Sequence, residues 1–262
     1  MAAPQDAPSS APPHSSSSSP PRPIVGIGAS AGGVGALREF FSHLPTEATS
    51  EEGEGEMAYV VILHLSPNVE SNLAEILQEE TPLPVARAED GVDVTGGTVY
   101  VIPPGQRLTI HDGRLRVDEA TGVHDPSSVD RFFRSLASDQ GENAVGLVLS
   151  GSGSDGTLGL RAIKEAGGIT MVQTPEEAEY ESMPESALAT GLVDLSLPVA
   201  QLAENLVLAS LLHTLHDAGP QVAVEQKRLE LLDRPAYGVR LLQHVHAVCV
   251  GLHHLAYALD MP

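Results

Sequence analysis

Two kinds of hydrophobic pattern alternate along the chain. Short runs of consecutive apolar residues are typical of strands buried on both faces of a sheet. Segments in which apolar residues recur every three or four positions follow these runs and indicate amphipathic helices. The predicted strands are PIVGIG, MAYVVILHLSP, GTVYVIPPG, NAVGLVL and ITMVQ. The predicted helices are GVGALREFFSHLP, NLAEILQEE, SSVDRFFRSLASD, GTLGLRAIKEAGG, SALATGL and AQLAENLVLASLLHTLHD.

One segment has a different pattern, because RLTIHDGRLRVDE alternates around the dipeptide Asp112-Gly113. An Asp-Gly pair between two such runs predicts a two-residue hairpin turn. Strands that alternate with helices indicate a parallel sheet. The sequence therefore predicts an α/β fold: a doubly wound, mostly parallel sheet with helices on both faces and a small antiparallel hairpin.

The patterned region does not extend over the whole chain. Residues 1–22 are rich in Ala, Pro and Ser, which cannot bury enough apolar surface to fold, so we expect a disordered tail. We expect one α/β domain over residues 23–200. Residues 201–262 are expected to form a C-terminal helical extension, whose role the sequence leaves open.

Composition narrows the class of protein. The formal net charge of −21 argues against non-specific binding to nucleic acid, because the phosphate backbone would be repelled. The single cysteine, Cys249, excludes an internal disulfide and a multi-cysteine metal site. No apolar run is long enough to cross a bilayer, and the N-terminus lacks the order of a secretory signal. We expect a cytoplasmic protein that does not insert into membranes.

Candidate chemistry lies where predicted strands end. In doubly wound sheets, functional groups lie beyond the carboxyl ends of the strands. Ser30 follows the first strand, His64 ends the second, and Asp155 follows a later one. These three residues are therefore expected to meet at one edge of the sheet.

The stretch IVGIGASAGG, from Ile24, permits two interpretations. G-x-G-x-x-A from Gly26 resembles a dinucleotide-binding turn, but that motif expects an acidic residue where His64 stands. G-x-S-x-G from Gly28 is the pattern of a nucleophile elbow, in which small neighbours allow a sharp turn that exposes Ser30. The histidine favours the elbow, and a plain glycine turn with a capping serine remains an alternative.

Ser30, His64 and Asp155 have the chemistry of a catalytic triad. A serine hydroxyl needs an adjacent base near neutral pH, and the base needs a group that fixes its tautomer. The alternatives are a hydrogen-bonded core histidine for His64 and, for Asp155, a cap of the helix GTLGLRAIKEAGG.

Six ordered motifs resemble one family. VGIGASAGG, HLSP, GTVYVIPPG, SSVDRFFRS, VLSGSGSDGTLGL and MPESALATGLVD together resemble the catalytic domain of CheB-type chemotaxis receptor protein-glutamate methylesterases, over residues 23–200. The resemblance implies a doubly wound α/β domain with Ser30, His64 and Asp155 as its triad.

The resemblance also implies a reaction. It is the hydrolysis of glutamate γ-methyl esters on the cytoplasmic helices of methyl-accepting chemotaxis receptors, with release of methanol, accompanied in many members by glutamine deamidation. The backbone N–H groups of Ala31 and Ser152 would stabilise the oxyanion, and no metal or cofactor would be needed. A chemotaxis methyltransferase or regulator acting in trans is a further expected partner.

The sequence departs from the family pattern at several points. Ser152 stands where methionine is common, and Ser182 where glycine is common. The segment HDPSSVD is longer than the usual helix-start motif, which leaves the role of His124 open between function and a surface position. Only the tail of residues 1–22 precedes the first strand, so we expect no receiver domain and no control by phosphorylation within this chain.

The C-terminal region does not follow the family. LLQHVHAVCVGLHHLAYALD carries four histidines, but no nearby acidic or cysteine ligand supports a metal site. A docking helix and a poorly ordered tail both remain open. A second functional class also remains: a catalytically weak module that binds receptors or partners through the same cleft.

Overall fold

The structure, a computed structural model, describes residues 23–45, 57–63, 72–119 and 127–206. Nine strands are present in these residues. They are β1 (Ile24–Ala29), β2 (Ala58–Leu63), β3 (Val85–Arg87), β4 (Val99–Val101), β5 (Gln106–His111), β6 (Arg114–Glu119), β7 (Ala144–Val148), β8 (Ile169–Gln173) and β9 (Leu195–Leu197).

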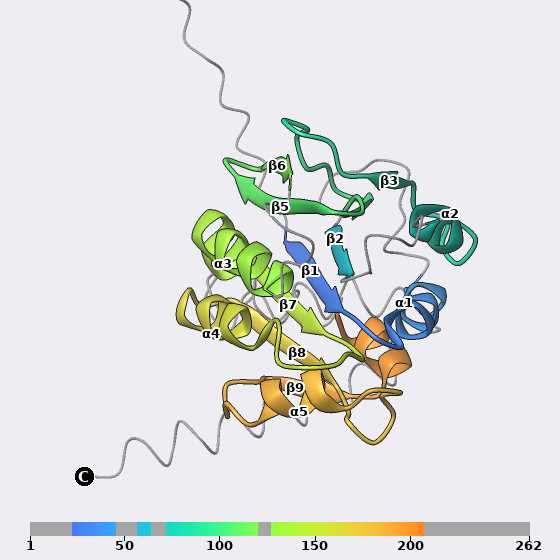
Figure 1. The fold of residues 1–262 in the computed structure, drawn as a ribbon, viewed down its shortest axis with the longest axis vertical. Helices are drawn as coiled ribbons and strands as arrows, with labels where there is room; N and C mark the ends of the chain where they lie inside the picture. Colours follow the sequence, from blue (N-terminus) through green and yellow to red (C-terminus); the bar gives the residue numbers. More distant parts are fainter. Residues whose placement is uncertain (1–22, 46–56, 64–71, 120–126, 207–262) are drawn as a thin grey trace, which may run out of the picture.

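Seven of these strands form one sheet in the order β3-β4-β2-β1-β7-β8-β9 (Figure 1). Every neighbouring pair in this sheet is parallel. The remaining two strands, β5 and β6, form an antiparallel hairpin beside it. The predicted fold class, a doubly wound sheet with a small hairpin, is confirmed.

Helices cover both faces of the seven-stranded sheet. They are α1 (Gly33–Ser42), α2 (Leu73–Gln78), α3 (Ser128–Gln140), α4 (Thr157–Glu165) and α5 (Ser182–Leu188), with a 3₁₀ turn, η2 (Gly141–Asn143), and a helical segment at 199–206. One hydrophobic core lies under α1, α2 and the 199–206 segment. The other lies under α3, α4, α5 and the hairpin, so each face of the sheet has its own core.

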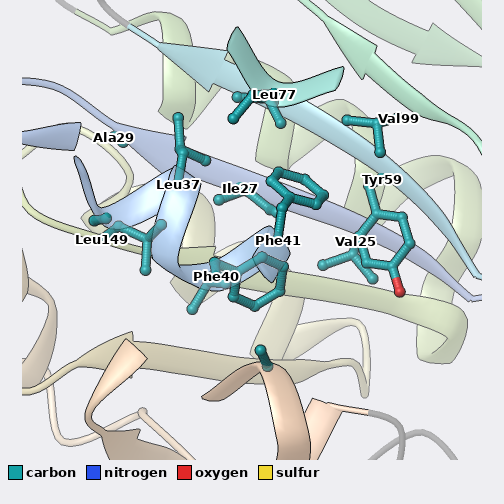
Figure 2. Close-up of a cluster of buried hydrophobic side chains, with 14 of the residues drawn as sticks. Val25, Ile27, Ala29, Leu37, Phe40, Phe41, Tyr59, Leu77, Val99 and Leu149 are labelled. Carbon is teal, nitrogen blue, oxygen red and sulfur yellow. The ribbon is translucent and has the colours of Figure 1, made fainter. Parts of the chain in front are cut away.

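The core under α1 holds three of the chain's few aromatic residues. Figure 2 shows Phe40 and Phe41 of α1 packed over Val25 and Ile27 of β1, with Tyr59 of β2 beside them. The ring centroids of Phe40 and Phe41 are 5.3 Å apart, and those of Phe41 and Tyr59 are 5.8 Å apart, both edge to face. Edge-to-face pairs contribute about 0.5–1.5 kcal/mol each beyond the burial of their surface.

On the opposite face, glycines of β1 allow α3 to approach the strand backbone. A Cβ atom at Gly28 would lie 2.2 Å from Cγ1 of Val129, and one at Gly26 would lie 2.9 Å from Cε1 of Phe133. No side chain other than hydrogen fits at Gly28 without a shift of the helix. The N-terminus of α3 therefore lies directly against the end of β1, which Ser30 follows.

The strand order reverses beside β1. The chain passes from β1 to β2 on one side of the sheet and later enters β7 on the other side. The carboxyl ends of β1 and β7 therefore border the crevice at which ligands bind in doubly wound sheets. The loops after these two strands carry Ser30 and Asp155.

Several predicted elements can be compared directly. The hairpin turn at Asp112-Gly113 is confirmed, with φ values of 51° and 69°, as a type I′ turn requires. Strands β3 and β9 were not predicted, because three-residue strands at the sheet edges give almost no pattern. Helix α5 begins at Ser182, four residues before the predicted SALATGL, because Pro184 in its first turn needs no N–H partner.

The predictions for the two ends of the chain are not tested by the structure. The tail of residues 1–22 and most of the extension at 201–262 lie outside the described residues. In the residues that the structure does describe, no helix is long and apolar enough to span a membrane.

Candidate active site

Ser30 lies in a tight turn between β1 and α1. Its carbonyl oxygen accepts a hydrogen bond from the N–H of Gly33 at 2.9 Å, and its own N–H donates to the carbonyl of Ser150 at 3.0 Å. Gly32, between them, has a φ of 71°. A Cβ atom there would also lie 2.7 Å from Oγ of Ser150, so the turn requires glycine for conformation and for space.

Ser30 and Asp155 face the same pocket. This pocket has a volume of about 280 Å³. It is lined by Ala29, Ser30, Ser152, Gly153, Ser154, Asp155 and Met183. The sequence prediction that Ser30 and Asp155 come together is therefore confirmed, although 125 positions separate them in the chain. Pockets for small ligands commonly start near 300 Å³, so this one suits a single side chain rather than a large molecule.

The carboxylate of Asp155 is held by backbone N–H groups at the start of α3. Oδ2 accepts from the N–H of Val129 at 3.0 Å, and Oδ1 accepts from the N–H of Asp130 at 2.9 Å. The N–H of Gly156 also donates to Oδ1. Of the helix that follows, GTLGLRAIKEAGG, which the alternative prediction had Asp155 cap, the carboxylate accepts the N–H of its first residue, Gly156, and its other two backbone bonds cap α3.

Three effects act on the pKa of the Asp155 carboxyl: burial and the nearby charge of Asp130 raise it, and backbone hydrogen bonds lower it. Burial raises the pKa of its carboxyl above the ordinary value of an aspartate, since the charged form loses solvation. The hydrogen bonds from Asp130 and Val129 lower the pKa but do not outweigh burial. The group is a partly buried carboxylate whose charge is favoured only by the N–H groups that hold it.

Helices α3 and α4 exchange caps. Asp155, just before α4, caps α3, and Asp130 of α3 accepts a hydrogen bond at Oδ1 from the N–H of Gly159 in α4 at 2.7 Å. Asp130 is buried, so this bond satisfies a group that water does not reach. Figure 1 shows the two helices side by side on one face of the sheet. Their mutual capping fixes the loop of Asp155 against α3.

The remaining predicted site residues have different outcomes. Ser152 lines the pocket, and Ala31 follows Ser30 in the turn. Among the described residues, the N–H groups of Ala31 and Ser152 donate no hydrogen bond. His64 and His124 lie outside the described residues. The strand that precedes His64 ends at Leu63, which is paired in register with Ala29.

Sequence reasoning missed two buried polar residues next to the site, Ser150 and Gln173. The N–H of Ser150 donates to Oε1 of Gln173 at 2.8 Å, and Oγ of Ser150 donates to the carbonyl of Ala31 at 2.9 Å. A signal was present: Ser150 directly follows the apolar run AVGLVL, and Gln173 is the last residue of the mostly apolar strand β8.

Comparisons with known proteins agree with this arrangement. A family profile described as CheB methylesterase matches residues 25–206. A protein-glutamate methylesterase/protein-glutamine glutaminase 1 of Xanthomonas campestris pv. campestris is 37% identical over 193 residues, which are 71% of this chain and 51% of that protein. A protein-glutamate methylesterase/protein-glutamine glutaminase of Halobacterium salinarum is 33% identical over 203 residues, covering 75% of this chain and 56% of that protein.

A solved structure is also similar. The crystal structure of the Thermotoga maritima CheB methylesterase catalytic domain superposes with a TM-score of 0.62 at 28% identity. The match covers 71% of this chain and 97% of that domain. The chain spans about half the length of the curated relatives that it matches. On the family profile, these relatives and the shared fold, the chain belongs to the CheB methylesterase family.

Proposed function

We propose that this protein hydrolyses glutamate γ-methyl esters on the cytoplasmic helices of chemotaxis receptors, with Ser30 as nucleophile. The observation that carries the proposal is the meeting of Ser30 and Asp155 at one pocket, beyond the carboxyl ends of β1 and β7. The family of the chain and the names of its relatives supply the substrate class. The substrate would place the reaction in the cytoplasm.

The proposed mechanism has two halves. His64 takes the proton of Ser30 as its oxygen attacks the ester carbonyl, and the N–H groups of Ala31 and Ser152 stabilise the oxyanion. His64 returns the proton to the departing methoxide, which leaves methanol and a glutamyl ester on Ser30. Water, deprotonated by His64, then attacks this ester, and His64 gives that proton to the Ser30 oxygen as the glutamate side chain leaves. Apart from the substrate and this water, every group in these steps belongs to the chain.

Asp155 would orient His64 and stabilise its charged form. An aspartate in this role works as the ionised group, because it accepts the second N–H of the imidazole. The hydrogen bonds from α3 fix the direction of the Asp155 carboxylate, which supports this role. The pairing of Leu63 with Ala29 supports the proposed role of His64, since it brings the end of β2 beside the end of β1.

Deamidation of receptor glutamines is a second proposed activity of the same site. A glutamine side chain has the shape of a glutamate methyl ester, with ammonia in place of methanol as the leaving group. The observation that favours it is the double name of the relatives, methylesterase and glutaminase. A methyltransferase or a regulator acting in trans would complete the system in which either activity operates.

The test is methanol release from a methyl-esterified receptor fragment. We expect Ser30→Ala to abolish release, because no other group replaces the nucleophile. Ser138→Ala is the matched control, since Ser138 is exposed on α3 and has no role in the pocket. Equal release from wild type and Ser30→Ala would contradict the proposal. No release from any folded protein, with several receptor fragments, would favour a binding module that uses the same cleft.

A further inference from the structure

We propose that the hydroxyl of Ser150 is a positioning group that holds both oxyanion donors of the site in place. This inference rests on the proposed function and extends it to a residue that does not touch the pocket. Ser150 follows β7, and only 1% of its surface is exposed. Its hydroxyl contacts the turn of Ser30 directly, and it acts on the loop after Ser150 through the backbone of Tyr180.

The first loop is the turn that contains Ser30. Ser150 contacts it twice, since its carbonyl accepts the N–H of Ser30 at 3.0 Å and its Oγ donates to the carbonyl of Ala31 at 2.9 Å. These two bonds flank the peptide between Ser30 and Ala31. The carbonyl of that peptide is bonded to the N–H of Gly33 at 2.9 Å. Because C=O and N–H point in opposite directions in a trans peptide, the N–H of Ala31 points away from the turn.

The second loop follows Ser150 itself. The carbonyl of Gly151 accepts the N–H of Met183 at 3.0 Å, so the N–H of Ser152, in the same peptide, points the opposite way. The N–H of Gly151 donates to the carbonyl of Tyr180 at 3.0 Å. The hydroxyl of Ser150 accepts the N–H of Tyr180 at 3.0 Å. The same oxygen therefore contacts the turn of Ser30 directly, and it reaches the loop after Ser150 through Tyr180, whose carbonyl holds the N–H of Gly151.

The chemistry of this contact requires a hydroxyl. Oγ of Ser150 donates to the carbonyl of Ala31 at 2.9 Å, with the carbonyl of Tyr180 farther away at 3.5 Å, and it accepts one backbone N–H, which a single O–H group can do at once. An alanine would leave the carbonyl of Ala31 and the N–H of Tyr180 without that partner. A threonine retains the group and adds one methyl.

Ser150 is itself anchored from the next strand. Its N–H donates to Oε1 of Gln173, whose Nε2 donates to Oε2 of Glu177 at 3.1 Å. The same carboxylate oxygen accepts the N–H of Val199 at 2.7 Å. Gln173 is buried at the end of β8, and Glu177 is exposed in the loop that follows, so this chain of hydrogen bonds connects Ser150 to β8 and to the start of the 199–206 segment.

The test compares Ser150→Ala and Ser150→Thr with wild type. Methanol release gives kcat and KM, and labelling of Ser30 by a fluorophosphonate probe reports the same oxyanion donors without a receptor. We expect Ser150→Ala to lower kcat and the labelling rate about 10- to 100-fold, with KM changed less than about threefold. The reason is that the N–H groups of Ala31 and Ser152 would shift by a fraction of an ångström from the position of the oxyanion. Ser150→Thr should restore most of both rates. The pH profile of kcat should keep its position, since the base is unchanged.

Each outcome decides between distinct conclusions. Labelling and kcat of folded Ser150→Ala at the wild-type level would overturn the positioning role and leave the proposed function intact. A wild-type protein that neither labels at Ser30 nor releases methanol would overturn the proposed function, and the positioning role with it. If Ser150→Ala does not fold, Ser150→Thr and its isostere Ser150→Val replace it. A Val variant as active as the Thr variant would overturn the role of the hydroxyl.

Discussion

Asp155 combines two tasks in one carboxylate. Its oxygens cap α3, which any aspartate in that position would do, and the same bonds fix the carboxylate that faces the pocket. Both tasks require the ionised carboxylate, and burial acts against them. The cap and the proposed pairing with His64 both favour the charged form, while burial favours the neutral form and raises the pKa of Asp155.

This raised pKa predicts how folding stability depends on pH. Because the pKa of Asp155 is higher in the folded state, the protonated carboxyl fits the folded protein better than the ionised one. Its contribution to stability is full below the unfolded-state pKa, about 3.9 for an aspartate, and is lost as the pH rises through the raised pKa. The free energy of unfolding of wild type, minus that of Asp155→Asn, should therefore fall with rising pH and then level off.

The measurement is urea unfolding of both proteins over this pH range. The signal is far-ultraviolet circular dichroism, since the chain has no tryptophan. Asp139→Asn is a matched control, because Oδ2 of Asp139 also accepts a backbone N–H, that of Gly113 at 3.1 Å, away from the pocket. A difference between wild type and Asp155→Asn that grows with pH would show that the cap outweighs burial in this site.

The packing of α3 on β1 connects the core to the site. Gly28 in β1 lies two residues before Ser30, and Val129 in α3 is both its closest neighbour and a donor to Asp155. A side chain at position 28 would push α3 away from the strand. The same displacement would move the N–H groups that hold Asp155, so packing and site geometry change together.

Two glycine substitutions test the tight packing at position 28. We expect Gly28→Ala to lower the free energy of unfolding by about 1–3 kcal/mol, because its Cβ atom would meet Val129 at 2.2 Å. Gly35→Ala, in α1, is the control, since a Cβ atom there meets nothing within 4 Å. Alanine is the better helix former by about 1 kcal/mol, so Gly35→Ala should be neutral or stabilising. Chemical unfolding measures both, and Gly28→Ala as stable as wild type would exclude tight packing at this position.

How far the sequence predicts the fold depends on burial. All or nearly all residues are buried in strands β1, β2, β7 and β8. Each of these strands is therefore a mostly apolar run that can be recognised in the sequence. Strands β3 and β9 have three partly buried or exposed residues each and lie at the two edges of the sheet. Their pairing comes from neighbours far away in the chain, which no local pattern records.

The site divides in the same way. Ser30 and Asp155 were predictable because each follows a buried strand, and the sheet brings such positions together. The cap of α3 by Asp155 and the contact of Ser150 with Ala31 join residues more than 20 positions apart, and Ser150 lies 119 positions from Ala31. These bonds depend on how α3 and the loops pack, which the order of residues shows only after the fold is known.

The charge of the chain bears on release of the proposed product. Hydrolysis converts a neutral methyl ester into a carboxylate, while the protein carries a formal net charge of −21. The segment 165–206, which contributes Met183 to the pocket, has acidic residues but no lysine or arginine. Several of these, among them Glu176, Glu179 and Glu181, are exposed. The product should therefore be repelled more strongly than the substrate.

This repulsion predicts a specific salt dependence. The Debye length falls from about 30 Å at 0.01 M salt to about 8 Å at 0.15 M, so added salt screens the acidic segment from the new carboxylate. A demethylated receptor fragment should be a weak competitive inhibitor at low salt. Its inhibition constant should fall, relative to the KM of the methylated fragment, as salt is added. Methanol release at both salt concentrations, with and without the demethylated fragment, gives the ratio of this inhibition constant to the KM. The double variant Glu179→Gln with Glu181→Gln should make the ratio depend less on salt. A ratio that does not change with salt would mean that the pocket, and not the field of the protein, separates substrate from product.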